Sequence, residues 1–259
     1  MHSNSRGHLA GPRVRRGAPL LIAIALLTAC SSSPSTSTAT TPATQVSTDA
    51  SRIVPKTAFD QLDRGWSLVA TATGTQIAVH RTANGPVSKK IRQGAGPLTF
   101  LVTAQKGDWL KVHLPTRPNG ATGWIPVEDV TLSTTPYRLV VSMDEHRLDL
   151  IEKGVRVRHY PIGVGKSTTP TPPGEYYLAE LIRPPNPEGG YGPYAFGLSA
   201  HSDALTSYAG GPGQLGLHGT NRPDLIGRDV SHGCIRIAND VITELARTVP
   251  LGSPIVIQA

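Results

Sequence analysis

Three residues in the C-terminal part of the sequence have side chains suited to nucleophilic catalysis. Cys234 is one of only two cysteines among 259 residues, and His232 stands two positions before it in the segment VSHGCIRI. His218 lies upstream, in the segment GLHGTN. Because a cysteine thiol is largely protonated at neutral pH, a nucleophilic cysteine needs a neighbouring base or positive charge, and a histidine can provide either. The pattern therefore predicts a cysteine nucleophile served by a histidine.

The neighbours of Cys234 indicate how its sulfur is presented. Gly233 permits unusual dihedral angles and a close approach of the backbone beside the sulfur. In a strand formed by CIRI, Cys234 and Arg236 share one face, because side chains alternate along a strand. Ile235 and Ile237 then point to the opposite face, toward a core. The strand is expected to carry chemistry on one side and packing on the other.

Four segments resemble signatures of the YkuD-type L,D-transpeptidases, a family of bacterial cell-wall enzymes. They are TPTPPGEYYL at residues 169–178, LHGTN at 217–221, IGRDV, and SHGCIRI at 231–237. His-Gly-Thr followed by Ser-His-Gly-Cys at this separation is a specific combination, and the similarity covers roughly residues 137–259. Arg236 departs from the pattern, since other members have asparagine at that position.

The resemblance implies cysteine acyl transfer. Cys234 would attack the carbonyl at the L-centre of a diamino acid in a tetrapeptide stem and expel the terminal D-alanine. His218 would accept the thiol proton and later activate an incoming amine. The backbone N–H groups of Gly233 and Cys234, helped by His232, are the candidates for the oxyanion site. The candidates for substrate binding are Ser231, Arg236, Thr220, Asn221 and Tyr194, of which Ser231 is expected to hold the turn.

The acceptor of the acyl group stays open. The amine of a second stem peptide would close a 3-3 cross-link, water would make the protein an L,D-carboxypeptidase, and a wall-anchored protein would become attached to peptidoglycan. Peptidoglycan stem peptides are therefore the expected partners. A carbapenem is expected to acylate Cys234 and inhibit the protein, because the family characteristically accepts this class of β-lactam.

Two other interpretations compete with a thiol acyltransferase. His218, His232 and Cys234 are acceptable zinc ligands. However, two of them are neighbours in one tight turn and no carboxylate stands near as a general base, so we expect neither a metal nor another cofactor. In the second alternative, a non-catalytic wall-binding lipoprotein, Cys234 is a small buried hydrophobic residue.

The N-terminus reads as an export signal over residues 1–29, with a basic start and the short apolar run LLIAIALLT. LTAC at 27–30 resembles the lipobox of bacterial lipoproteins, which implies lipidation of Cys30; an ordinary cleaved signal is the alternative. A Ser/Thr/Pro-rich stretch at 30–57 has too few apolar residues to fold and is expected to be a tether. The protein is therefore predicted to be extracytoplasmic, lipid-anchored to the cell membrane and facing the cell wall.

The charge balance gives little support to nucleic-acid binding. The formal net charge is +7, but residues 1–29 hold four arginines and no acidic residue, so their removal lowers it to +3. A nucleic-acid-binding domain is usually much more basic. We expect no nucleic acid among the partners.

The folded part is predicted to be predominantly β, in two domains. The stretch KGDWLKVHLPTRPNGATGWIPVEDV resembles a bacterial SH3-like domain, expected at 58–133 as a small β-barrel. Its Trp109 and Trp124 either line a binding groove or pack in the core. Short alternating runs after a Thr-Pro link predict a β-sandwich catalytic domain at 136–259.

Two segments of the second domain stand out from its strands. NDVITELAR is the one expected helix, capped by Asn239 or Asp240. The Pro- and Gly-rich loop at 183–197 is either a flap over a cleft, with Tyr191 and Tyr194 against substrate, or a plain surface loop. Three further histidines, His146, His159 and His201, are expected to be exposed or bonded rather than catalytic.

Overall fold

Strands dominate the part of the chain that the computed structural model describes, residues 62, 64–94, 96–207 and 211–259. All of these residues belong to one compact unit, and the predicted predominantly β class is confirmed. No helix among them is both long and apolar enough to cross a bilayer. The predicted signal, the tether and Cys30 lie outside the described residues.

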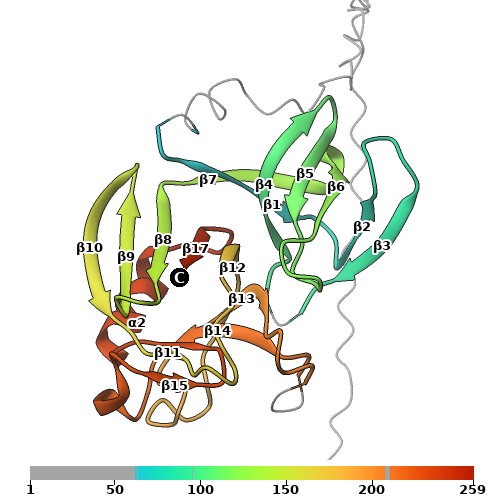
Figure 1. The fold of residues 1–259 in the computed structure, drawn as a ribbon. Helices are drawn as coiled ribbons and strands as arrows, with labels where there is room; N and C mark the ends of the chain where they lie inside the picture. The colour runs from blue at the N-terminus through green and yellow to red at the C-terminus, as the bar shows by residue number, and fades with distance from the viewer. Residues whose placement is uncertain (1–61, 63, 95, 208–210) are drawn as a thin grey trace, which may run out of the picture. The chain divides into compact units, whose positions relative to one another are not determined.

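The first sheet has seven strands, which Figure 1 draws in blue to green. Side chains alternate as predicted: in β5, Leu110 and Val112 are fully buried, whereas Trp109, Lys111 and His113 are half-buried. Trp109 and Trp124 both lie outside the buried cluster of this sheet, and Trp109 donates a hydrogen bond to Asn84 at 2.7 Å. The SH3-like assignment and the domain boundaries stay predictions. The strand order is β3 (Val87–Arg92), β2 (Gln76–His80), β6 (Thr122–Pro126), β5 (Trp109–His113), β4 (Thr99–Lys106), β1 (Ser67–Ala72) and β7 (Val130–Thr135).

The second sheet has eight strands and contains the segments that the sequence singled out for chemistry (Figure 1). A separate pair, β11 (Val164–Gly165) and β15 (Asp229–Ser231), runs parallel. Single 3-10 turns occur at η1 (Val127–Asp129) and η2 (Pro223–Leu225). The order of the eight strands is β10 (Val155–Pro161), β9 (Arg147–Glu152), β8 (Tyr137–Ser142), β17 (Pro254–Gln258), β12 (Gly174–Ile182), β13 (Ala195–His201), β14 (Gln214–His218) and β16 (Ile235–Arg236).

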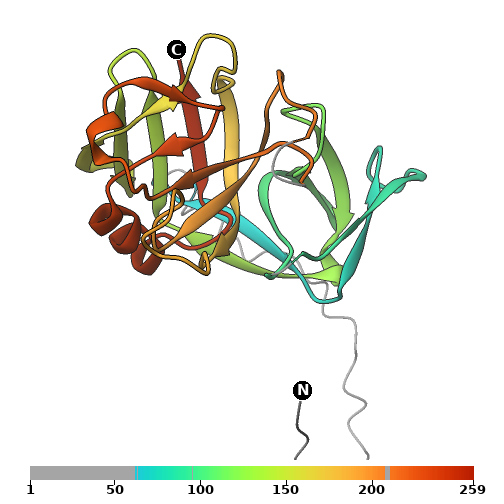
Figure 2. The same cartoon turned by 90° about the horizontal axis from the view of Figure 1, so that it is seen from below.

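The predicted helix is present as α2 (Asn239–Thr248), which Figure 2 shows at one side of this sheet. Ile242 and Leu245 are fully buried, as the helical periodicity predicts. The predicted cap is wrong: Ala238 occupies the N-cap and no side chain caps the helix. The Asn239 side chain instead accepts a hydrogen bond from the Thr220 N–H at 2.8 Å. It therefore ties the helix to the segment that follows β14.

The parallel pairing of β14 with β16 brings the two catalytic candidates together. Leu217 pairs with Ile235, and His218 pairs with Arg236. Cys234 directly precedes β16, two positions before the residue that pairs with His218. A strand separation of about 4.8 Å combined with two residues along the strand places the two Cα atoms about 8 Å apart. Ile235 is fully buried on the opposite face. The alternation predicted for CIRI is confirmed.

Candidate active site

Cys234 and His218 line the same two cavities. The larger has a volume of about 340 Å³ and is walled mainly by apolar side chains. The smaller has a volume of about 140 Å³ and is also lined by Ser231, His232 and Arg236. Cys234 can therefore be approached through either cavity. The face of CIRI that the sequence predicts to carry Cys234 and Arg236 is the face that borders the smaller cavity.

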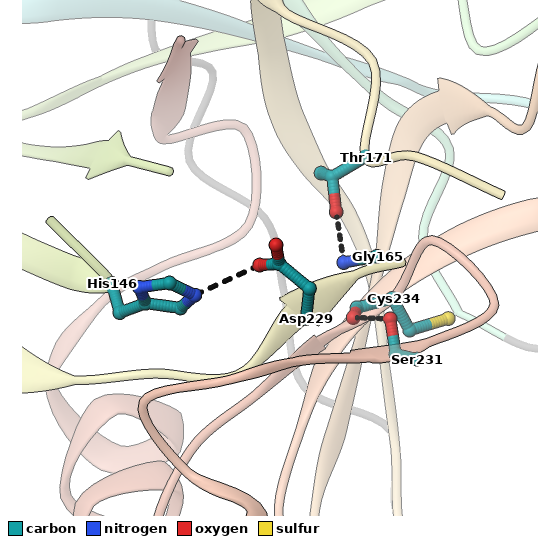
Figure 3. Close-up of polar contacts among 6 residues, drawn as sticks. All are labelled: His146, Gly165, Thr171, Asp229, Ser231 and Cys234. Carbon is teal, nitrogen blue, oxygen red and sulfur yellow. Dashed lines mark hydrogen bonds and ion pairs between the residues drawn. The ribbon is translucent and has the colours of Figure 1, made fainter. Parts of the chain in front are cut away.

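A tight turn holds Cys234 in place (Figure 3). The Ser231 hydroxyl donates to the Cys234 carbonyl oxygen at 2.5 Å and accepts from the Gly233 N–H at 3.0 Å. Gly233 adopts φ +111°, a region that side chains rarely occupy. In Figure 3 the sulfur points away from the Ser231 hydroxyl. Ser231 thus closes the turn, and the Gly233 N–H that was a candidate oxyanion donor is already bonded. The remaining candidates are the Cys234 N–H and His232, which lines the smaller cavity.

Two threonines of the TPTPPG segment donate hydrogen bonds to the backbone of this turn. The Thr171 hydroxyl donates to the Gly233 carbonyl oxygen and accepts from the Gly165 N–H, both at 2.9 Å. The Thr169 hydroxyl donates to the Ser231 carbonyl oxygen at 3.2 Å. Both threonines are buried. In the sequence this segment was identified only by its resemblance to a family signature. Its two successive Thr-Pro pairs were the feature that could have indicated that both hydroxyls bond the same turn.

His218 is oriented by the backbone and is 3% exposed. Its Nδ1 lies 2.6 Å from the Gly219 carbonyl oxygen, so Nδ1 carries the proton and Nε2 is the basic nitrogen. Burial lowers the pKa of the imidazole from 6.5 to about 4; the Gly219 hydrogen bond opposes this shift, and the charge of Arg236 adds to it slightly. The Tyr191 ring meets the imidazole edge to face at 4.8 Å. The neutral base therefore predominates at neutral pH.

Burial also sets the protonation of the nucleophile. It raises the pKa of the Cys234 thiol, while a backbone hydrogen bond with Gly216 and the charge of Arg236 partly offset the rise. Together with the lowered pKa of His218, this favours a neutral thiol and a neutral imidazole in the resting protein. In such a pair a thiolate forms only when the thiol passes its proton to the imidazole.

The other predicted substrate-binding residues are divided among different places. Arg236 borders the smaller cavity, and its Nε is buried without a hydrogen-bond partner among the described residues. Thr220 and Asn221 line a separate cavity beside the start of α2. Tyr194 packs against the core with the Arg183 guanidinium over its ring at 5.4 Å. Thr220, Asn221 and Tyr194 therefore border neither of the two cavities that contain Cys234.

The loop between β12 and β13 forms one wall of the larger cavity. Pro184, Pro185 and Tyr191 line that cavity, and Tyr191 also lines the smaller one. The loop thus lies over the site, as the flap interpretation expects. The tyrosine that reaches the site is Tyr191 and not Tyr194, because a loop without periodicity gives no indication of which of its rings turns inward.

The remaining histidines lie elsewhere. His146 donates through Nε2 to the Asp229 carboxylate at 2.8 Å, which ties the β8–β9 turn to β15 (Figure 3). His159 is exposed on β10, and His201 is buried at the end of β13. None of the three borders either cavity that contains Cys234. Across the described ranges, no three His, Cys, Asp or Glu side chains are grouped as metal ligands.

Similarity to known proteins is concentrated on the second sheet. The model of the YkuD family, the L,D-transpeptidase catalytic domain, matches residues 136–257. A Bacillus licheniformis protein, by name the L,D-transpeptidase YkuD, is 42% identical over 120 residues, which are 46% of this chain and 64% of that protein. The chain thus spans slightly less than two thirds of that relative's length.

One further relative and one solved structure carry the same kind of name. The Bacillus subtilis (strain 168) protein called L,D-transpeptidase YqjB is 30% identical over 142 residues, 51% of this chain and 76% of that protein. A solved L,D-transpeptidase from Mycobacterium smegmatis matches with a TM-score of 0.40 at 20% identity, over 61% of this chain and 80% of that chain.

Proposed function

Because the chain belongs to the YkuD family of L,D-transpeptidases, we propose that it joins peptidoglycan stem peptides through an acyl-enzyme on Cys234. The observation that carries this proposal is the arrangement of Cys234 and His218 along two shared cavities, with the proton of His218 committed to the Gly219 carbonyl. A nucleophile, a fixed neutral base and two approaches to the sulfur are the parts that acyl transfer between two substrates requires.

The first half-reaction forms a thioester. Nε2 of His218 takes the thiol proton as the Cys234 sulfur attacks the carbonyl of the third residue of a tetrapeptide stem. The bond from this carbonyl to the terminal D-alanine breaks, and the departing amine takes the proton back from His218. The Cys234 N–H stabilises the oxygen that becomes negative in between, an effect typically worth about 3 kcal/mol for one such donor.

The second half-reaction returns the sulfur to its thiol form. An amine from a second stem loses its proton to His218 and attacks the thioester, so that a new amide bond forms while the carbon–sulfur bond breaks. A stem amine as acceptor gives the 3-3 cross-link. The apolar larger cavity disfavours water at the thioester, which favours transfer over hydrolysis.

The charge of Arg236 gives the substrate a direction. This residue borders the smaller cavity, where the carboxylate of the departing D-alanine can pair with its guanidinium. The donor's leaving group then occupies the smaller cavity, and the acceptor amine enters on the same side once the D-alanine has left. The acyl part of the donor extends into the larger cavity beneath the loop that carries Tyr191.

Products measured by mass spectrometry test the proposal. The protein lacking residues 1–30 is incubated with disaccharide tetrapeptides; a cross-linked dimer is expected, a tripeptide would reveal a carboxypeptidase, and a stem joined to an added protein would reveal attachment. Incubation with a carbapenem should add its intact mass to the wild type and nothing to Cys234→Ala. A folded wild type that forms neither a product nor an adduct would overturn the cysteine mechanism.

The place of action is part of the proposal. We propose that the protein is anchored outside the cytoplasm by a lipid on Cys30, which the LTAC segment supports. The mass of the mature N-terminal peptide tests this, because a diacylated Cys30 start is expected and an unmodified start at another residue would contradict it.

A further inference from the structure

One carboxylate lies in the larger cavity with the nucleophile. Glu180 is on β12, where a register shift follows Leu178, and it pairs across to Gly197 of β13. Gly197 in turn pairs with Gly216 of β14. Glu180, Gly197 and Gly216 therefore form one row across three strands. Adjacent strands are about 4.8 Å apart, so the row spans about 10 Å and ends at the glycine whose backbone is bonded to the Cys234 sulfur.

The glycine in the middle of this row leaves space for the carboxylate. A Cβ placed on Gly197 would lie 2.6 Å from Oε1 of Glu180 and 2.9 Å from Nε2 of Gln214. The Glu180 side chain is thus folded over β13, toward the strand that carries His218. Ala195, Gly197 and Gly216 line the cavity beside Glu180, and their small or missing side chains leave space there.

The charge of Glu180 is not matched within the described part of the chain. No hydrogen bond or ion pair joins its carboxylate to another described residue, and Gln214 donates to the Leu198 carbonyl oxygen instead, at 3.0 Å. No lysine or arginine lines the larger cavity. Glu180 is half-buried, and a ligand that covered its carboxylate would remove the remaining water, which is costly unless the ligand supplies a cation. A ligand that fills this cavity should therefore bring a positive charge to Glu180.

We infer that Glu180 binds the side-chain ammonium of the diamino acid whose carbonyl Cys234 attacks, and so selects the donor. This inference rests on the proposed function. An extended lysine-type side chain places its nitrogen six bonds from the carbonyl carbon, or about 7 to 8 Å. This length is comparable to the separation between Gly216 and the Glu180 carboxylate, which is folded back over Gly197. Lysine-type and diaminopimelate-type donors both have an amine beyond the attacked carbonyl, and the shared ammonium is what Glu180 recognises.

Glu180 and Arg236 would then bind charged groups on the two sides of the bond that is cleaved. Glu180 meets the ammonium on the acyl side, in the larger cavity, while Arg236 meets the carboxylate on the leaving-group side, in the smaller cavity. The two charges thus line different cavities that meet at Cys234, and the side-chain ammonium and the terminal carboxylate of a tetrapeptide donor likewise lie on different sides of the attacked carbonyl. A donor bound in the reverse direction would place like charges together.

The test compares two donors and two variants. The purified protein is given a tetrapeptide stem with a free side-chain amine and the same stem with that amine acetylated. Glu180→Gln removes the charge and keeps the shape, and Glu152→Gln makes the same change on β9, outside both cavities that contain Cys234. The readouts are KM and kcat for D-alanine release, with iodoacetamide alkylation of Cys234 as a check that the thiol is intact.

For the free-amine donor, Glu180→Gln should raise KM about 10- to 100-fold with kcat little changed, because an ionic hydrogen bond is lost from the bound substrate. The acetylated donor should react poorly with the wild type and equally poorly with Glu180→Gln. Glu152→Gln should behave as the wild type. Equal losses on both donors, or no loss on the free-amine donor, would overturn the role of Glu180. A wild type that releases D-alanine from neither donor would instead overturn the proposed function.

Discussion

The Nδ1 nitrogen of His218 lies 2.6 Å from the carbonyl oxygen of the next residue, Gly219. A carbonyl oxygen can only accept, so this contact fixes the tautomer without a carboxylate partner. In a Ser-His-Asp triad the third residue also stabilises the imidazolium that forms. A backbone carbonyl carries no full charge, and the imidazole of this protein accordingly keeps a low pKa.

We predict that His218 makes the free energy of unfolding depend on pH. The pKa of its imidazole is lowered from 6.5 to about 4 by burial, so between these values the unfolded chain binds a proton that the folded protein does not. The contribution is complete above pH 6.5 and is lost as the pH falls toward 4, by about 3 kcal/mol in total. Urea unfolding across this range measures the slope.

The matched variant for this measurement is His218→Gln, which should flatten the slope. Burial also lowers the pKa of His113 and of His201, so both contribute in the same direction and remain in the variant. The relevant quantity is therefore the difference between wild type and variant. Equal slopes would mean that the imidazole of His218 is not held neutral by the fold.

We predict that Cys234 is alkylated slowly at neutral pH. Burial raises the pKa of its thiol, so the rate with iodoacetamide should reach its midpoint above that of an unperturbed cysteine, about 8.5. Arg236→Gln removes a charge that lowers this pKa and should move the midpoint further up. Arg247→Gln, an exposed arginine of α2, should leave it in place. A wild-type midpoint well below 8.5 would show a stored thiolate instead.

The sequence was sufficient for the parts of the site that depend on local pattern. The alternation of side chains in CIRI predicted that Cys234 and Arg236 share a face. This prediction depends only on the geometry of a single strand. The Thr171 hydroxyl could not be placed in this way, since one of the groups that it bonds, the Gly233 carbonyl, is 62 residues away in the chain. Asn239 looked like a helix cap, but a tertiary contact to the Thr220 amide takes its side chain.

We predict that Thr171→Val weakens both the fold and the site. The substitution keeps the shape but leaves the Gly165 N–H and the Gly233 carbonyl without the hydroxyl that joins them, which should lower the free energy of unfolding by about 2 to 4 kcal/mol. Acylation by a carbapenem should slow as the turn loosens. Thr248→Val removes an exposed hydroxyl bonded to the Glu244 carbonyl and should cost under about 0.5 kcal/mol. Similar losses in the two variants would contradict the role of Thr171.

We predict that Gly233→Ala is more damaging than a glycine-to-alanine change at another left-handed position. At Gly233 the added Cβ would meet the Leu215 side chain at 2.8 Å, in addition to the strain of φ +111°, so a loss of about 2 to 4 kcal/mol is expected. Gly227 has φ +86° but no atom within 4 Å of the same Cβ, so Gly227→Ala should cost only about 1 kcal/mol. Chemical denaturation measures the loss of stability in both variants, and carbapenem acylation measures the effect on the site. Equal losses in Gly233→Ala and Gly227→Ala would rule out a cost from the contact with Leu215.

The final prediction concerns Arg117, which lies between β5 and β6 of the first sheet and reaches the cavity wall of the second. Its guanidinium donates to the carbonyl oxygens of Ser202, Leu205 and Pro212 at 2.8, 3.0 and 3.1 Å. Pro212 lines the larger cavity, so Arg117 links the segment between β5 and β6 to the wall of that cavity. Arg117→Ala should speed amide exchange at Ser202 and raise KM for the donor severalfold while global stability falls by only about 1 to 2 kcal/mol. Arg81 is an exposed arginine directly after β2, and Arg81→Ala should change neither amide exchange nor KM. Unchanged exchange and KM in Arg117→Ala would mean that the cavity wall holds its shape without the first sheet.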